Sequence, residues 1–450
     1  MGMRDFSDSS CSRQVAFKTL GCKLNQAETE SLATKFQELN WTVVDFGEQA
    51  DAIVVNGCTV TNTADRKSRS AINRALRSGN GEALVVMAGC FVDGQGTSWQ
   101  GADDERTLAV GNDLKSRIPE IVDAYFHGEL ENLPTEGNRF DYVQPHRVFR
   151  TRAMIKIQDG CDQFCSYCII PHVRGGGVSR PMAEVLQALR QALEDGYKEV
   201  VLTGVNMSRW EDGTHSFAHL VKACLEVEGD FRLRLGSVEP DRIDGALMEL
   251  MNHPRMTPHM HLCLQSGSEA ILTQMRRPYT AQEFDTMVAQ LRQKVPHFNI
   301  TTDVIVGFPG ESEAEFAETL QRCENLTFGH IHTFPFSRRH GTEADAMGEQ
   351  VSEPVKKERA EKVRQISLQT KFTYRQSLLG STQKVLVERC QEDGDGSIML
   401  RGLAPCYVPV RFPLPAGMTE GEALNNFFDV EIHAVDSGDD PDLLGKAQTD

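Results

Sequence analysis

Short apolar runs alternate with helical patterns over most of this 450-residue chain. In the first 130 residues the expected strands are residues 15–20, 52–55 and 83–88, and the expected helices are residues 26–39 and 64–77. Buried strands that alternate with helices at this spacing are typical of a parallel sheet covered by helices. We therefore expect an N-terminal parallel α/β domain at residues 14–131.

The same alternation resumes after a Pro- and Gly-punctuated linker and repeats about six times. The expected strands are residues 154–158, 199–203, 231–236, 261–265, 299–306 and 330–336, with helices such as 182–194 and 313–323 between them. Six βα units are enough for an open, partial version of the barrel that takes eight. We expect this partial (βα)6 barrel at residues 150–378, where a long charged helix at 353–379 ends it.

The last 70 residues change in character, because short strands replace the strand–helix alternation. The expected strands are residues 384–388, 407–412 and 427–432. This pattern is typical of a small all-β module, and we expect a β-barrel at residues 379–446. The fold class is therefore α/β with an added small β-barrel.

Three cysteines occupy the same position in the N-terminal pattern. Cys22, Cys58 and Cys90 each follow a glycine and lie one to three residues beyond an expected strand. The carboxyl ends of parallel strands meet at one edge of a sheet, where ligand sites gather. A glycine lets the backbone turn tightly beside a bulky group. We expect the three thiols to converge; the alternative is three unrelated buried cysteines.

The most specific pattern is Cys161-x-x-x-Cys165-x-x-Cys168, directly after the first strand of the barrel. Twelve cysteines scattered at random over 450 positions would give about 0.01 such patterns per chain. A cubane iron–sulfur cluster has four irons and usually four thiolate ligands. Three cysteines would leave one iron free to bind a substrate. The alternative is a structural zinc site, which needs a fourth ligand, and His172 is the nearest candidate.

Cysteines are expected to be metal ligands rather than disulfide partners only in a compartment where thiols stay reduced. The chain contains no run of 18 or more apolar residues, and residues 1–14 carry Asp5, Asp8 and four serines without an apolar segment. We therefore expect neither a membrane span nor a secretion signal, and a cytoplasmic location. The other six cysteines have no partner spacing and are expected to be structural: residues 11, 224, 263, 323, 390 and 406.

The formal net charge of −17 disfavours nucleic acid as a partner, but the local distribution of charge decides. Residues 66–77 carry five basic residues and no acidic one, and these fall on one side of the expected helix. The alternative is a solvated helix face. Residues 356–375 have a net charge of +5, whereas residues 427–450 have a net charge of −6. The C-terminal tail is therefore not expected to bind nucleic acid.

The cysteine loop resembles the signature of the radical S-adenosylmethionine (SAM) superfamily. Together with Cys22, Cys58 and Cys90, the chain resembles the methylthiotransferase branch over about residues 14–445. Supporting stretches are LTGVNMSRW from Leu202, LGSVEP from Leu235, HLCLQSGSEAILTQMRRPYT from His261, DVIVGFPGES from Asp303 and HTFPFSRRHGTEADAM from His332. The resemblance implies two 4Fe-4S clusters: an auxiliary one on these three cysteines, and a catalytic one on Cys161, Cys165 and Cys168 that cleaves SAM. It also implies that the C-terminal barrel is a TRAM module, which helps to hold RNA.

Two stretches point to a subfamily. FKTLGCKLNQAETE from Phe17 and IKIQDGCDQFCSYCIIP from Ile155 resemble members that act on N6-threonylcarbamoyladenosine at position 37 of tRNA. Sister groups modify N6-isopentenyladenosine at the same position or an aspartate of a ribosomal protein. The implied reaction methylates a sulfur of the auxiliary cluster with one SAM. A radical from a second SAM then removes hydrogen from C2 of adenine, and the sulfur couples to that carbon.

The implied partners are the tRNA anticodon loop and an electron donor such as flavodoxin or ferredoxin, with no membrane. A different class of function stays open, in which both cysteine sets hold structural zinc or are inert and the chain is a non-enzymatic scaffold. Iron in the purified protein would separate the two classes, because iron–sulfur clusters colour a protein brown and zinc does not.

The resemblance further implies the SAM contacts. Tyr167 is expected beside the SAM adenine, unless it only supports the loop. Thr203, Gly204 and Asn206 end the second barrel strand, near the SAM amino group. Glu239 and Gln265 end the third and fourth strands, where a ribose would lie; ordinary strand-end solvation is the alternative. Five further side chains are interpreted from their type alone: Arg276 and Arg277 as phosphate contacts or surface charges, and Phe328, Phe334 and Phe336 as core rather than base-stacking platforms.

Overall fold

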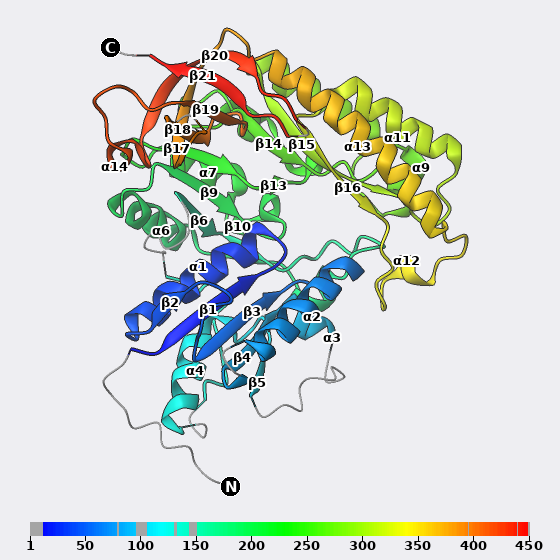
Figure 1. Cartoon of the computed structure of the whole chain (residues 1–450). Helices are drawn as coiled ribbons and strands as arrows, with labels where there is room; N and C mark the ends of the chain where they lie inside the picture. The colour runs from blue at the N-terminus through cyan, green and yellow to red at the C-terminus, as the bar shows by residue number, and fades with distance from the viewer. Residues whose placement is uncertain are drawn as a thin grey trace.

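The computed structural model describes residues 12–78, 81–95, 106–129, 133–143, 151–394, 396–438 and 440–448. The expectations for residues 1–11, including Cys11, lie outside these ranges. Figure 1 shows three units: an N-terminal α/β unit in blue and cyan, a central strand–helix unit in green and yellow, and a C-terminal barrel in orange and red. No helix in the described ranges is long and apolar enough to cross a membrane.

The N-terminal unit is a five-stranded parallel sheet in the order β2-β1-β3-β4-β5. Buried side chains of α1 and α4 pack on one face of the sheet, and those of α2 and α3 pack on the other. Both central strands, β3 and β4, are buried along their whole length, as expected for a parallel sheet covered on both faces. The elements are β1 (Gln14–Thr19), α1 (Lys23–Glu38), β2 (Thr42–Val44), β3 (Ala52–Gly57), α2 (Asn62–Arg77), β4 (Leu84–Gly89), α3 (Cys90–Gln95), β5 (Thr107–Val110) and α4 (Ile118–His127).

The central unit contains the six expected parallel strands, and its open arrangement confirms the partial barrel. The strand order is β6-β9-β12, continued through β13 to β14-β15-β16. The strands are β6 (Arg152–Lys156), β9 (Glu199–Thr203), β12 (Arg232–Leu235), β13 (Ser237–Val238), β14 (His259–Leu262), β15 (Asn299–Val306) and β16 (His330–Pro335). Short antiparallel pairs join β7 (Gln158–Asp159) to β8 (Val178–Ser179) and β10 (Glu211–Asp212) to β11 (His215–Ser216).

Helices cover the outer face of the central strands, and alternate strand residues such as Val200, Leu202, Leu233 and Leu262 pack against them in one large core. The helices are α5 (Ile170–Arg174), α6 (Met182–Glu194), α7 (Phe217–Leu225), α8 (Gly245–Leu250), α9 (Glu269–Gln274), α10 (Ala281–Lys294), α11 (Glu313–Leu326), α12 (Glu343–Ala346) and α13 (Glu353–Gln376). Because side chains alternate along a strand, the remaining residues point into the barrel.

The C-terminal unit is a closed barrel in the order β17-β18-β19-β21-β20, which confirms the expected small β-barrel. Its elements are β17 (Thr382–Glu392), β18 (Ile398–Leu403), β19 (Pro409–Pro413), α14 (Glu420–Ala423), β20 (Phe427–Val435) and β21 (Leu443–Ala447). The connection between β18 and β19 docks on the central strands: Arg232 Nη2 donates to the Leu403 carbonyl at 2.9 Å, and Asn299 Nδ2 donates to the Cys406 carbonyl at 2.7 Å.

Candidate active site

The structure brings Cys22, Cys58 and Cys90 together. They follow β1, β3 and β4, which are neighbours in the sheet, so the three cysteines lie at one edge. Burial raises the pKa of the Cys58 thiol to about 11, and the nearby thiolates of Cys22 and Cys90 add to this effect. Thiolates repel one another in this way only at short range. The three cysteines therefore lie together at one edge of the sheet, as the strand–Gly–Cys pattern predicts.

Gly21 and Cys22 form the open side of this first cysteine set. Gly21 has a φ of +97°, and a Cβ at this position would lie 2.7 Å from the Cys58 Cβ, so only glycine fits without displacement. Cys22 is exposed to water, but the surrounding protein still displaces part of the water around its thiol. This desolvation is the main cause that raises the pKa of Cys22. A thiol that is both accessible and crowded lies in a hollow.

The second set, Cys161, Cys165 and Cys168, lies in the loop after β7. Burial raises the pKa of Cys168 to about 12, and the thiolates of Cys165 and Cys161 also raise it. Arg277 Nη1 donates to Cys165 Sγ at 3.1 Å. The candidate fourth ligand, His172, is exposed, and its ring packs edge-on against Phe164 with the centroids 6.0 Å apart.

The spacing of the thiols tests which group each set fits. Within the described ranges, the one group of three His, Cys, Asp or Glu ligand atoms that all lie within 4.8 Å of one another is His261, Cys263 and Asp303. Tetrahedral zinc with a Zn–S distance of about 2.3 Å holds its sulfurs about 3.8 Å apart. Neither cysteine set forms such a group in the described ranges, so in neither set do all three sulfurs lie as close together as a single zinc ion would hold them.

Arg174 joins the two cysteine sets. It ends α5, six residues after Cys168, and its side chain reaches into the N-terminal unit. Its Nε donates to Cys90 Sγ at 3.0 Å, and its Nη2 donates to the Asn25 side-chain oxygen at 2.7 Å. Its Nη1 pairs with Asp159 Oδ1 at 2.8 Å. Sequence reasoning missed this residue, and the only local signal is an arginine that ends the apolar stretch after the cysteine loop.

The predicted SAM contacts on the second strand border the cysteine loop. Asn206 Nδ2 lies 3.7 Å from Cys161 Sγ, and the Asn206 amide donates to Gln158 Oε1 at 2.8 Å. Thr203 is buried at the end of β9, and a Cβ at Gly204 would lie 3.0 Å from the Gln158 carbonyl oxygen. A pocket of about 280 Å³, lined by Gln158, Cys161, Asn206 and Arg209 among others, opens here.

The remaining predicted SAM contacts surround Cys165. Glu239 forms an ion pair with Arg277. Gln265 is buried just beyond β14 with a φ of +67°, a strained conformation that is common at functional sites. Tyr167 packs against an apolar cluster that includes Met275 and Phe336.

Two interpretations made from residue type are wrong. The exposed fraction of the Arg277 side chain is 3%, so it is neither a surface charge nor a phosphate contact. Phe334 is 41% exposed and therefore not core, because it lies on the same face of β16 as His332 and lines a groove at the end of this strand. Phe328 and Phe336 are buried, as expected.

Comparisons with known proteins decide the family. Residues 155–323 match the radical SAM superfamily, and residues 14–111 match the Uncharacterized protein family UPF0004. The chain is 35% identical over 415 residues to the threonylcarbamoyladenosine tRNA methylthiotransferase MtaB of Bacillus subtilis, which covers 88% of this chain and 90% of that protein. The chain belongs to the radical SAM tRNA methylthiotransferase family.

Other relatives of this methylthiotransferase carry a different name or share only its fold. It is 33% identical to the tRNA-2-methylthio-N(6)-dimethylallyladenosine synthase of Syntrophotalea carbinolica, over 85% of this chain and 90% of that protein. A solved structure of the radical SAM methyltransferase TsrM from Kitasatospora setae covers 72% of this chain and 73% of that one, with a TM-score of 0.53 and 14% identity. That similarity supports the fold alone.

A groove on the methylthiotransferase lies beside its first cysteine set, since Gly21, the residue before Cys22, is one of its lining residues. It has a volume of about 960 Å³ and lies between the end of β1, the start of α2 and the end of β16. Gly21 lies at its inner wall, and Phe334, Arg66, Lys67 and Arg338 contribute to its sides. The lining therefore combines an aromatic side chain with three cations, together with the carboxylate of Glu353.

The C-terminal barrel closes the opposite end of the methylthiotransferase's central unit, a role that the sequence did not indicate. Tyr407, with a φ of +64°, stacks on His259 at a centroid distance of 4.8 Å. Arg234 and Arg152 lie over the same ring, at 4.6 and 5.6 Å from its centre. Burial opposes ionisation of the phenol, but Lys23, Arg152 and Arg234 outweigh it and lower the pKa of Tyr407 to about 8.

Proposed function

We propose that this enzyme places a methylthio group on C2 of N6-threonylcarbamoyladenosine at position 37 of tRNA. The observation that carries the proposal is that Cys90 of the first set packs against Ile169, the residue after Cys168 of the second set, and accepts a hydrogen bond from Arg174. A groove of about 960 Å³ lies beside the first set. The name of the Bacillus subtilis relative supports the choice of nucleoside. The same chemistry on N6-isopentenyladenosine-37, or on an aspartate of a ribosomal protein, is the alternative, and the Syntrophotalea carbinolica relative favours the former.

SAM and an iron–sulfur cluster are the cofactors of the superfamily to which the chain belongs. We propose two 4Fe-4S clusters, one held by Cys161, Cys165 and Cys168 and an auxiliary one held by Cys22, Cys58 and Cys90. When bound, these groups supply the radical chemistry and the sulfur that are needed to replace a C–H bond which acid–base side chains cannot activate.

The protein's own residues hold the reacting groups in place. Hydrogen bonds to cluster sulfurs tune the reduction potential of iron–sulfur proteins, and Arg277 and Arg174 are placed to donate such bonds at Cys165 and Cys90. We propose that Thr203, Gly204, Asn206, Glu239, Gln265 and Tyr167 contact SAM. A flavodoxin or ferredoxin would supply electrons in the cytoplasm.

The test is mass spectrometry of nucleosides from bulk tRNA after anaerobic reaction with the iron-loaded enzyme, SAM and a strong reductant. We expect a methylthio mass gain on threonylcarbamoyladenosine. A gain on isopentenyladenosine instead would overturn the substrate and keep the chemistry. If no nucleoside changes while 5′-deoxyadenosine still forms, the substrate is a protein.

A variant with Cys161, Cys165 and Cys168 all changed to Ala separates the cluster proposal from the substrate proposal. We expect this variant to keep the iron of the first cysteine set, to lose the rest and to produce no 5′-deoxyadenosine. Unchanged iron content in this variant would contradict the assignment of these cysteines as ligands.

A further inference from the structure

The inward face of β14, β15 and β16 is polar, and the space that it borders, called the hollow below, is partly open to water. Along β14, β15 and β16 the alternate residues Met260, Leu262, Ile300, Val304 and Ile331 belong to the outer core. The residues between them point inward: His259, His261, Thr301, Asp303, His330 and His332. His332 is exposed and His330 is half-buried although strands surround them, so water reaches the inside of the barrel.

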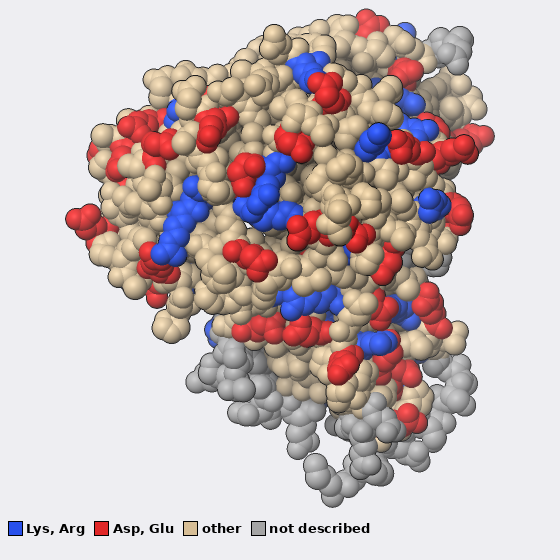
Figure 2. Space-filling view, turned by 180° about the vertical axis from the view of Figure 1, so that it is seen from behind, with Lys and Arg blue, Asp and Glu red and all other residues tan. Residues whose placement is uncertain are grey.

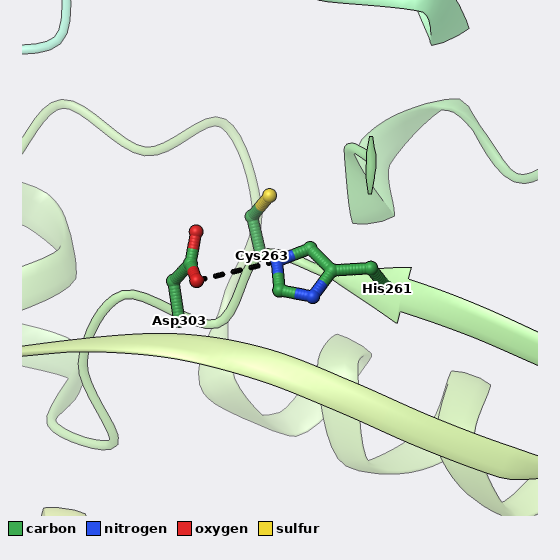
Figure 3. Close-up of side chains that lie close together, drawn as sticks. All are labelled: His261, Cys263 and Asp303. Carbon is green, nitrogen blue, oxygen red and sulfur yellow. Dashed lines mark ion pairs between the residues drawn. The ribbon is translucent and has the colours of Figure 1, made fainter. Parts of the chain in front are cut away.

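Most charges that border this hollow are already neutralised. Glu199 pairs with Arg232 and Arg234 at 2.5 and 2.6 Å. Figure 3 shows the Asp303 carboxylate turned toward the imidazole of His261, and the two are 3.3 Å apart. The cations at the base of β6 are paired as well, Arg152 with Glu388 at 3.0 Å and Lys156 with Glu28 at 2.8 Å.

Lys23 is different from these cations. Its Nζ lies 5.1 Å from the centre of the Tyr407 ring and is close enough to His332 on the polar face to affect it electrostatically. No carboxylate of the described ranges lies within ion-pair distance of Lys23, and the nearby Glu199 is occupied by its two arginines. Lys23 is also the first residue of α1, where the positive end of the helix disfavours a cation. A partly buried cation in this position is stabilised when an anion binds beside it.

The position of Lys23 next to Cys22 links this cation to the reacting atom of the substrate. In adenine, C2 and the N6 substituent lie on the same edge, on either side of N1. A base whose C2 approaches the sulfur at the first cysteine set therefore brings its N6 substituent close to the residues beside Cys22. The hollow lies directly beyond, where His332 and Lys23 act on each other electrostatically.

We propose that Lys23 binds the carboxylate of the threonylcarbamoyl group and thereby selects this nucleoside over one with an apolar N6 substituent. The inference rests on the proposed function, because it names the side chain that would recognise that substrate. An isopentenyl group carries no charge, and would leave Lys23 without an anion in a place that water only partly reaches. An aspartate of a protein would offer the same charge, and the RNA probes below separate that case.

The experiment is a cycle that changes the lysine and the carboxylate separately. Three anticodon stem-loop RNAs of one sequence carry threonylcarbamoyladenosine, its neutral threonine amide analogue or isopentenyladenosine at position 37. Wild-type enzyme, Lys23→Met, Lys23→Arg and the control Lys362→Met are loaded with iron. Lys362 is an exposed lysine of α13 that pairs only with its helix neighbour Glu358. Binding is measured by fluorescence anisotropy, and product is measured by nucleoside mass spectrometry.

We expect wild-type enzyme to bind the carboxylate RNA about 10- to 100-fold more tightly than the amide RNA, the range for hydrogen bonds to charged groups. Lys23→Met should bind both equally, and Lys23→Arg should recover part of the difference. Lys362→Met should behave as wild type. Because the wild-type comparison needs no variant, it tests the proposal even where Lys23→Met fails to load iron.

The outcomes separate the two proposals. If wild-type enzyme methylthiolates the threonylcarbamoyl RNA but binds the amide equally well, the role of Lys23 is overturned and the proposed function stands. The role of Lys23 is overturned in the same way if Lys23→Met retains the full preference for the carboxylate. If wild-type enzyme modifies only the isopentenyl RNA, or no RNA, the proposed function fails and the inference fails with it.

Discussion

At the scale of single residues, one arginine donates to a sulfur in each cysteine set. Arg174 Nε lies 3.0 Å from Cys90 Sγ, and Arg277 Nη1 lies 3.1 Å from Cys165 Sγ. Charge-assisted hydrogen bonds of this kind stabilise a thiolate, the form of cysteine that binds a metal. Both guanidiniums are also held by carboxylates, Asp159 and Glu239. Their orientation is therefore fixed before any cluster binds.

Gly21→Ala should abolish the auxiliary cluster and spare the other one. The new Cβ would lie 2.7 Å from the Cys58 Cβ and 3.0 Å from its Sγ, so Cys58 must move. The matched control is Gly128→Ala, which also has a left-handed φ, of +73°, but has no atom within 4 Å of the new Cβ. Iron analysis and 5′-deoxyadenosine formation measure the two effects. We expect Gly21→Ala to lose iron and still cleave SAM, and the control to keep both; equal iron in the two variants would contradict the prediction.

Tyr407 should ionise near pH 8 in the folded protein. Its three neighbouring cations outweigh burial and lower its pKa from the usual 10 to about 8. Because the folded pKa is below the unfolded one, the stabilisation is fully present above about pH 10 and is lost as the pH falls through 8. The measurement is a tyrosinate absorbance titration of iron-free protein, with Tyr407→Phe as the blank. Lys23→Met should move the transition to higher pH, and an unmoved transition would argue against the contact between Lys23 and Tyr407.

At the scale of elements, the fold could be predicted wherever burial leaves a pattern in the sequence. β3 and β4 are apolar throughout because both of their faces are covered. In the first sheet and the C-terminal barrel, four strands were not predicted, namely β2 and β5 at the edges of the sheet and β18 and β21 in the barrel. Their burial is mixed and they are short, so no clear period appears. α1 begins at Lys23 rather than residue 26, since Cys22 provides no side-chain capping bond and the usual start signal is missing.

The residues of the candidate site also differ in whether the sequence alone predicts them. The six cysteines were found because each set has a local pattern. Lys23, Arg174 and Tyr407 were missed, and Arg277 was misinterpreted, because their roles depend on contacts between distant parts of the chain. Arg174 meets Cys90 over 84 positions, and Arg277 meets Cys165 over 112. No periodicity within a single element records such a contact.

The two basic segments singled out in the sequence differ once they are folded. On α13 most cations are paired or buried: Lys356 with Glu353, Arg359 with Glu311, Lys362 with Glu358, and Lys371 and Arg375 with Asp440. On α2, by contrast, Arg66, Lys67, Arg74 and Arg77 are exposed and have no carboxylate of the described ranges within ion-pair distance. Figure 2 shows the face opposite to that of Figure 1, where acidic side chains lie among the basic ones without a continuous basic area.

We therefore expect α2 to contact RNA phosphates. Arg66 and Lys67 line the groove beside the first cysteine set. Arg66→Gln with Lys67→Gln should weaken tRNA binding and lower the slope of log affinity against log salt by about 0.7 to 0.9 for each phosphate that is no longer neutralised. Lys357→Gln with Lys362→Gln, two exposed lysines of α13, is the matched control. The prediction is wrong if both double variants bind tRNA with the same salt slope.

At the scale of the whole molecule, a buried ion network joins the N-terminal unit to the central one. Glu28 on α1 pairs with Lys115, Lys156 and Arg174, and no side chain in this group is more than 5% exposed. Burial opposes the charge of Glu28, but the three cations hold its pKa well below the usual range. The network joins α1 to β6, which lie next to each other in Figure 1, and its Arg174 also donates to Cys90 of the first cysteine set. The relative position of the two sets therefore depends on this network.

Arg174→Met should loosen the N-terminal unit from the central one. Removing one partner leaves buried carboxylates partly uncompensated, at a cost of about 3 to 5 kcal/mol. The matched control is Arg359→Met, because Arg359 pairs with Glu311 at 2.6 Å, is as deeply buried, and has both partners within the central unit. Hydrogen exchange read by mass spectrometry should rise in α1 for Arg174→Met and remain at the wild-type level there for Arg359→Met.

The measurement is made on iron-loaded protein and repeated after iron is removed, so that loss of a cluster is distinguished from loss of the ion network. We expect the difference between the two variants in both states, because the charges of Glu28 and Asp159 are present with or without iron. Exchange in α1 that rises only in the iron-loaded state would assign the effect to the Cys90 hydrogen bond. Equal exchange in both variants would mean that apolar contacts, such as those of Ala27 with Met154 and Val201, hold the two units together without the network.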